Sequence, residues 1–155
     1  MRQMLGAFSA AACAAGLALV GAVAATPEEN QAAFLRRDDA MKELGRSFNV
    51  NIGRVASGRA PLSPDTVASA ESVTRIVATL PTRFPPGSDV PESHLKSELL
   101  ADRARADELI AIVQADAAVL VQAAKTGDRG QIAVAYKTLN DACNTCHNEF
   151  RKPYE

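Results

Sequence analysis

Five consecutive residues near the end of the chain could bind a cofactor covalently: Cys143-Asn144-Thr145-Cys146-His147. The pattern C-x-x-C-H is the attachment signature of a c-type haem. The two thiols can add to the two vinyl groups at one edge of a porphyrin, and the histidine that follows can offer a ring nitrogen to the iron. The second axial position would then decide what the iron does. The motif therefore predicts one haem c, with its iron, bound through Cys143, Cys146 and His147.

Three other interpretations of the two cysteines remain open, and each explains less of the motif. A zinc site needs four protein ligands, or three and a water, but outside the motif the chain has only His94 and Cys13 as further histidine and cysteine. A thioredoxin-like dithiol is expected beside a βαβ pattern, whereas the sequence around Cys143 has helical periodicity. A structural disulfide, which an oxidising compartment would permit, leaves His147 without a role.

The composition is that of a single helical domain. The chain has 155 residues, of which 47% are hydrophobic and only 5% are aromatic, and this length suits one domain. Alanine is abundant, and closely packed helices tolerate it well. Lysine and arginine total 17 while aspartate and glutamate total 18, so the charge pattern predicts no nucleic-acid partner.

The first 24 residues have the pattern of a secretory signal peptide. Arg2 supplies a positive start, and Met4 to Val20 is an uncharged run rich in alanine, leucine and glycine. Ala22-Val23-Ala24 fits a cleavage site with the cut before Ala25, and a cut one residue later fits equally well. The alternative is an uncleaved membrane anchor, since the run is nearly long enough to span. We expect cleavage, which leaves no stable membrane span in the domain formed by residues 25–155.

The remaining sequence predicts four amphipathic helices and no strand. Apolar residues recur at steps of three and four, as on one face of a helix. The expected helices run from about Glu28 to Ser57, from Ser63 to about Leu80, from Pro91 or Glu92 to Lys125, and from Asp128 to about Lys152. Four prolines between residues 81 and 93 exclude regular helix there and predict a long crossover. The fold class is therefore all-α, an antiparallel four-helix bundle with a C-terminal covalent haem site.

The fourth predicted helix carries the motif on its inward side. Its apolar positions are Ile132, Tyr136, Leu139, Cys143, Cys146 and Phe150. His147 follows Cys143 by one helical turn, so both thiols and the imidazole belong to neighbouring positions of one face. Cofactor sites in helix bundles are built from such inward side chains. The spacing thus agrees with haem attachment inside a bundle.

The chain resembles the class II c-type cytochromes, which include cytochrome c′ and its low-spin, Met-ligated relatives. The haem motif lies near the C-terminus and continues as Asn148-Glu149-Phe150-Arg151-Lys152, as in that family. The first helix contains Arg37-x-x-x-Met41-Lys42, and the middle contains Leu80-Pro81 followed by Phe84-Pro85-Pro86-Gly87-Ser88. The likeness covers nearly all of the chain after the signal peptide.

The resemblance implies a role for each matching residue. Cys143 and Cys146 would form the thioethers, and His147 would be the proximal iron ligand. Arg37 would lie near a haem propionate, which a cation suits, unless it is a solvated arginine. Arg151, one turn after His147, would lie near the proximal imidazole, unless it serves as a charge at the helix C-terminus.

Met41 is the second candidate iron ligand, and two functions depend on it. If its sulfur binds iron, the haem is low-spin and suits electron transfer with redox partner proteins; this is the main prediction. If Met41 only packs, the iron is five-coordinate and binds nitric oxide or another small gas. Lys42 and Glu43 point away from the Met41 face, so no enzymatic activity is expected. Export by the signal peptide predicts the periplasm as location, and the resemblance implies a homodimer as a possible assembly.

Overall fold

The computed structural model describes residues 25–153, so the predicted signal peptide, including Cys13, lies outside the described residues. Six α-helices, a π-helix and a 3-10 helix follow one another in the described chain. They are α1 (Pro27–Leu44), η1 (Gly45–Ile52), α2 (Gly53–Ala56), α3 (Pro64–Ala78), η2 (Leu80–Thr82), α4 (Glu98–Ala101), α5 (Arg103–Thr126) and α6 (Arg129–Phe150).

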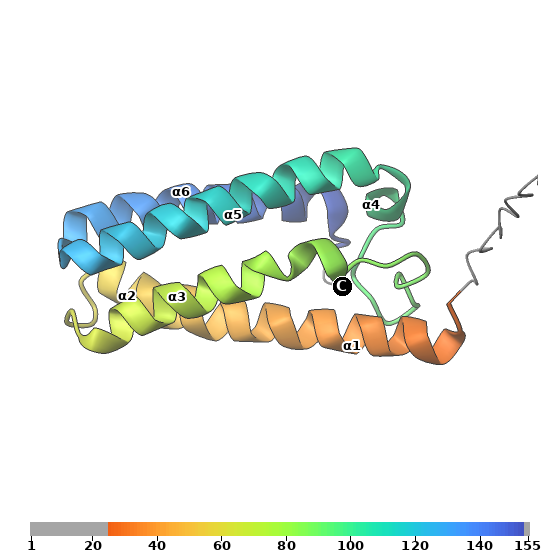
Figure 1. Cartoon of the computed structure of the whole chain (residues 1–155), viewed down its shortest axis with the longest axis horizontal. Helices are drawn as coiled ribbons and strands as arrows, with labels where there is room; N and C mark the ends of the chain where they lie inside the picture. Colours follow the sequence, from red (N-terminus) through yellow and green to blue (C-terminus); the bar gives the residue numbers. More distant parts are fainter. Residues whose placement is uncertain (1–24, 154–155) are drawn as a thin grey trace, which may run out of the picture.

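The helices form an antiparallel four-helix bundle, which confirms the predicted fold class (Figure 1). The first rod is continuous and consists of α1, η1 and α2; α3, α5 and α6 are the other three. The principal packing partners are α5 with α6, α3 with α5, α3 with η1, and α2 with α6. Short connections join the rods at one end of the bundle, and the crossover from α3 to α5 occupies the other (Figure 1).

Local sequence signals fix where the long helices begin and end. Thr26 and Ser63 each form a capping box before a proline in the first turn, an arrangement that satisfies amide groups left free at a helix start. Asp128 caps α6 by accepting a hydrogen bond from the Gln131 amide at 3.0 Å. Gly127 ends α5 with a φ of 69°, a left-handed conformation that glycine adopts without strain.

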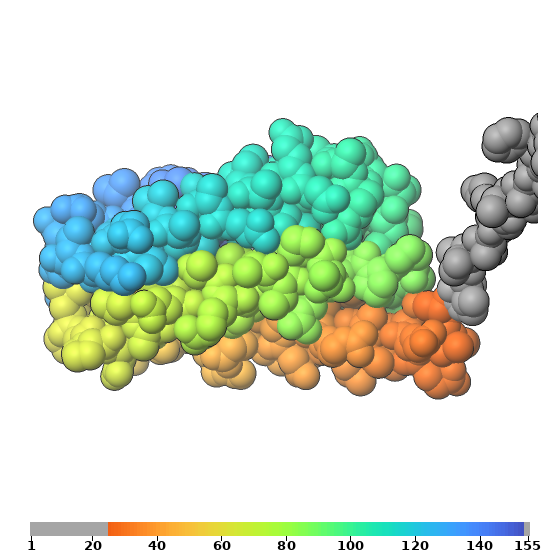
Figure 2. Space-filling view, viewed as in Figure 1, coloured from red at the N-terminus to blue at the C-terminus, as the bar shows by residue number. Residues whose placement is uncertain are grey.

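The core consists of aliphatic side chains from all four rods. The most deeply buried large ones are Ile52, Val73, Val77, Leu99, Leu120, Ile132 and Leu139. In Figure 2 the side chains of α3 fill the space between α1 and α5. Among the described residues, α5 alone is long and apolar enough to pass a length-and-composition test for a membrane span. It packs against both α3 and α6, as a central helix of a bundle does.

The first rod changes its winding between two glycines. The sequence predicts local weakening of the helix at Gly45 and Gly53, and residues 45–52 are a π-helix. Within this π-helix, Phe48 packs its ring against Tyr136 of α6 with the ring centroids 4.6 Å apart. A Cβ at Gly53 would lie 3.0 Å from the Tyr136 hydroxyl oxygen. Glycine therefore permits the close approach of the first rod to α6.

The prediction that the third long helix begins at Pro91 or Glu92 is wrong, because α5 begins at Arg103. The backbone of residues 93–96 instead pairs with the end of α6: the Lys96 amide donates to the Phe150 carbonyl at 2.9 Å. Asp102 (φ −105°, ψ 69°) then interrupts the helical winding between α4 and α5, and its side chain accepts from the Arg105 amide at 3.1 Å. Tertiary pairing thus overrides the helical periodicity before residue 98.

Candidate cofactor site

Three residues of the C-x-x-C-H motif share one face of α6. Cys143, Cys146 and His147 are half-buried, and both cysteines pack against the hydrophobic core. Both are free thiols. The intervening Asn144 and Thr145 are exposed, so the helix turns its reactive atoms inward and its polar atoms outward. This arrangement brings together the residues that the sequence predicts for the proximal side.

Burial keeps these groups uncharged. It raises the pKa of the Cys143 thiol to about 11, and it also raises the pKa of Cys146. Burial is the main cause of a lowered pKa of His147, and the cation of Arg151 lowers it further. An imidazole that stays neutral retains the lone pair that binds a metal. Two apolar thiols and a neutral imidazole on one helix face form a donor set that fits a covalently attached haem.

The zinc, dithiol and disulfide interpretations find no support in residues 25–153. This part of the chain holds no group of three or more His, Cys, Asp or Glu side chains that could bind a metal ion. The cysteines lie within an α-helix of a bundle, rather than beside a βαβ unit, and they are not bonded to one another. Haem attachment is therefore the chemistry that the described residues fit best.

Met41 lies on α1, in the half of the first rod that precedes the π-helix. Its side chain is half-buried and packs against the same hydrophobic core as Cys143 and Cys146. The neighbouring charges are engaged elsewhere: Lys42 pairs with Asp38 at 2.6 Å, and Glu43 accepts hydrogen bonds from Arg46 and Ser47. Lys42 and Glu43 are thus paired with other residues, while the face of α1 that carries Met41 also carries the buried Arg37 one turn earlier.

Arg37 is buried, with 6% of its surface exposed, which is contrary to the alternative of a solvated arginine. Its two terminal nitrogens donate four hydrogen bonds to the crossover: to the Arg83 carbonyl, to both Ser88 oxygens, and to the Ser93 hydroxyl. Its guanidinium also lies 5.4 Å from the Phe84 ring centroid. These bonds use all four terminal N–H groups, so the Nε–H is the remaining donor of the guanidinium; its proximity to a propionate stays a prediction.

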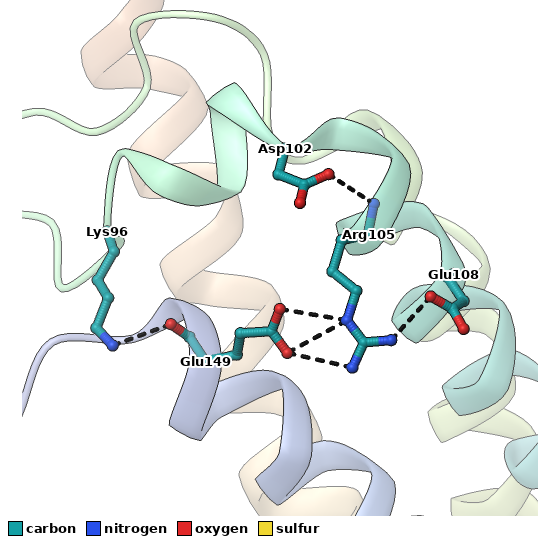
Figure 3. A network of polar contacts seen from close by, with 5 residues as sticks. All are labelled: Lys96, Asp102, Arg105, Glu108 and Glu149. Carbon is teal, nitrogen blue, oxygen red and sulfur yellow. Dashed lines mark hydrogen bonds and ion pairs between the residues drawn. The ribbon is translucent and has the colours of Figure 1, made fainter.

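The end of α6 is bound to the crossover by a second set of contacts, which the sequence analysis missed (Figure 3). Lys96 donates through its ammonium group to the carbonyls of Asn148 and Glu149 at 3.3 and 2.9 Å. Arg105 bonds the Glu149 carboxylate and also Glu108. Lys96 satisfies two carbonyls in the last turn of α6. Both cations lie at the negative end of the helix that carries the motif, where a positive charge is favourable. In the sequence, only the charges of Arg105 at the start of α5 and of Glu149, two residues after His147, could have suggested this contact.

Known proteins resemble this chain in sequence and in architecture. Residues 32–151 match the sequence model of the family described as cytochrome c′. A cytochrome c′ of Pararhodospirillum photometricum is 32% identical over 120 residues, which cover 75% of this chain and 93% of the relative. A cytochrome c-556 of Agrobacterium tumefaciens is 28% identical over 120 residues, with the same coverage of 75% and 93%.

Solved structures agree with these sequence matches. The crystal structure of cytochrome c′ from Rubrivivax gelatinosus superposes with a TM-score of 0.74 at 26% identity, over 79% of this chain and 97% of that one. A carbon monoxide-bound variant of cytochrome c′ from Alcaligenes xylosoxidans gives a TM-score of 0.73 at 25% identity, over 83% and 98% of the two chains.

The fold and the site define a haem protein built on a four-helix bundle. The chain belongs to the cytochrome c′ family of class II c-type cytochromes. It binds one c-type haem, and it is a non-enzymatic haem protein. The family resemblance inferred from the sequence is thereby confirmed.

Proposed function

We propose that this chain is a periplasmic haem protein that binds nitric oxide or carbon monoxide. Cys143 and Cys146 would hold the haem by thioether bonds, and His147 would bind the iron on the proximal side. When bound, the haem supplies an iron with one axial position for a small gas. Export by the predicted signal peptide accounts for the periplasmic location.

The pairing of the charges next to Met41 is the observation that favours gas binding. Lys42 is engaged by Asp38 of α1, and Glu43 is engaged by Arg46 and Ser47 of η1, so neither offers a free acid or base beside Met41. An apolar surface excludes water and suits a neutral diatomic ligand. One relative supports this choice: structures of two variants of cytochrome c′ from Alcaligenes xylosoxidans contain carbon monoxide and nitric oxide, respectively.

Electron transfer through a Met41-ligated iron is the second candidate function. It is favoured by the half-buried position of Met41 against the same core as the two cysteines. A Met/His iron would be low-spin and closed to gases, whereas an iron with His147 alone would be open. The two candidates therefore make opposite predictions for one measurement.

The test is the visible absorption spectrum of the reduced holoprotein with and without carbon monoxide. A high-spin spectrum that shifts on addition of the gas is the expected result. Sharp low-spin bands that the gas leaves unchanged would contradict the proposal and support Met41 ligation. In the latter case Met41→Leu, which preserves the side-chain volume, would convert the protein to a gas-binding form.

His147→Ala supplies the control for the proximal ligand. The haem should remain attached to both cysteines after acid–acetone extraction, while the spectrum loses the signature of axial histidine. Loss of the haem on extraction from the unaltered protein would remove the basis of the proposal. Formation of a homodimer and contact with a redox partner stay predictions; the mass of the holoprotein in solution tests the first.

A further inference from the structure

Ser93 lies at the point where the crossover touches two helices that barely touch each other. It is buried, with 4% of its surface exposed. Its hydroxyl oxygen accepts hydrogen bonds from the Arg37 guanidinium at 2.8 Å and from the Leu95 amide at 3.0 Å. Its carbonyl oxygen accepts from the Lys152 ammonium at 3.3 Å. One serine thus contacts α1 through its side chain and Lys152, two residues after the end of α6, through its backbone carbonyl.

The following residues extend this connection. The Lys96 amide donates to the Phe150 carbonyl, and the Lys152 amide donates to the His94 carbonyl at 2.7 Å. Together with the Lys96 side chain, which binds carbonyls of the last turn of α6, these bonds fix the end of the motif helix to residues 93–96. Direct packing between α1 and α6 is slight by comparison. The crossover therefore joins these two helices by hydrogen bonds at this end of the bundle, in addition to the packing of α1 against α3 and of α6 against α5.

We propose that Ser93 is a positioning residue that sets the separation between the helix of Met41 and the helix of His147, and so controls gas access. The inference rests on the proposed function for the identity of the gas site. Met41 follows Arg37 by one turn, and His147 precedes Arg151 by one turn, so each ligand candidate lies next to an anchored position. A looser anchor increases the motion of α1 relative to α6, and with it the rate at which a small gas reaches the site.

Ser88 provides a matched control. It is fully buried, and it also accepts hydrogen bonds from Arg37, through its hydroxyl at 3.1 Å and its carbonyl at 2.9 Å. No hydrogen bond described in the structure joins Ser88 to α6. Ser88→Ala and Ser93→Ala each remove one hydroxyl acceptor from Arg37. Ser93→Ala also leaves the buried Leu95 amide without its acceptor, so it should lose more stability in urea than Ser88→Ala. Only Ser93→Ala removes an acceptor from the segment that holds α6.

The first measurement is amide hydrogen exchange in the holoprotein. In Ser93→Ala we expect the Lys96 and Lys152 amides to exchange about fivefold to tenfold faster, the factor expected for the loss of one hydrogen bond. In Ser88→Ala their exchange should change by less than about twofold. Unchanged protection of both amides in Ser93→Ala, or an equal change in the two variants, would overturn the proposal.

The second measurement is the association rate of carbon monoxide with the reduced holoprotein. Ser93→Ala should increase it by about threefold or more, while Ser88→Ala leaves it close to that of the unaltered protein. An unchanged rate in Ser93→Ala overturns the role in gas access even if the amides exchange faster. A holoprotein that does not bind the gas at all contradicts the proposed function. In that case the amide exchange rates and the absorption spectrum of the reduced holoprotein decide whether Ser93 is a positioning residue.

Lys152→Ala keeps the test available if Ser93→Ala fails to fold. The Lys152 side chain is exposed, so its removal leaves the core intact while it deletes the bond to the Ser93 carbonyl. We expect faster exchange at Lys96 and a faster gas association, both smaller than for Ser93→Ala. If both rates equal those of the unaltered protein, Ser93 does not connect the two helices.

Discussion

At the scale of single residues, Arg37 is a buried cation surrounded by neutral oxygens. Burial lowers the pKa of its guanidinium, while the more distant carboxylates of Asp89 and Asp38 raise it. Four hydrogen bonds and the rings of Phe34 and Phe84 offset the cost of removing the charge from water. The position of Arg37 on an inward face was predictable from its spacing, but its partners were not, because they lie 46 to 56 residues away.

Arg37→Leu should therefore lower the free energy of unfolding by about 3 kcal/mol, because it leaves buried carbonyl and hydroxyl oxygens without a donor. Urea denaturation of the holoprotein measures the change. Arg36→Leu is the control: its side chain is exposed, and we expect a change within about 0.5 kcal/mol. Equal effects of the two substitutions would refute a special role of Arg37.

Cys143 should make the haem-free chain sensitive to alkali. Its pKa is raised from 9.0 to about 11 by burial, so the folded chain keeps a proton that the unfolded chain releases. The contribution to stability is fully present below pH 9 and is lost between about pH 9 and pH 11, a fall of about 3 kcal/mol. Urea unfolding across this range should show a steeper fall than in Cys143→Ser. Parallel pH profiles of the two chains would contradict this prediction. In the holoprotein the effect should be absent, because a thioether sulfur has no proton to lose.

At the scale of elements, the sequence was most informative about helix ends that are set by the residues at the end itself. Capping at Thr26, Ser63 and Asp128 and the stop at Gly127 are local, so the corresponding ends were predictable to within a few residues. The start of α5 was not, because residues 93–96 pair with a strand-like end of α6 that is distant in sequence. The sequence suggested only a weakness of the helix at two glycines, and these glycines flank the π-helix.

The glycines at the two ends of the π-helix should respond differently to alanine. A Cβ at Gly45 has no neighbour within 4 Å, so Gly45→Ala should stabilise the protein by about 0.5–1 kcal/mol through helix propensity. A Cβ at Gly53 would lie 3.0 Å from the Tyr136 hydroxyl and 3.3 Å from Cζ. Gly53→Ala should therefore lose this gain or become destabilising, as thermal unfolding of the two variants will show. An equal gain at both positions would mean that Tyr136 moves freely.

At the scale of the whole molecule, the side chains between the first rod and α6 are packed in one part of the bundle and left half-buried in another. Phe48 and Tyr136 stack where the first rod meets α6, whereas Met41, Cys143, Cys146 and His147 are left half-buried. The chain has few aromatic side chains that could cover the apolar surface of these residues. A haem placed against them would cover that surface instead. The four-helix architecture was predictable from periodicity alone; the difference between these two parts required the structure.

Removal of the haem should consequently weaken the whole bundle. The double substitution Cys143→Ser and Cys146→Ser prevents attachment and should lower the melting temperature by about 10 °C or more. Thermal unfolding followed by circular dichroism measures it. Val134→Ser is a control for general surface effects, because Val134 is 69% exposed. A melting temperature close to that of the holoprotein would show that the haem contributes little to the core.

The capping box at the start of α1 has a consequence for maturation. The Thr26 amide donates to the Glu29 carboxylate at 2.7 Å. A protease that cuts before Ala25 leaves this amide as it is, with one residue in front of it. A cut before Thr26 turns the same nitrogen into a terminal ammonium, and the bond to Glu29 becomes charge-assisted. The choice between two adjacent peptide bonds would then set how firmly the first turn of the mature protein is held.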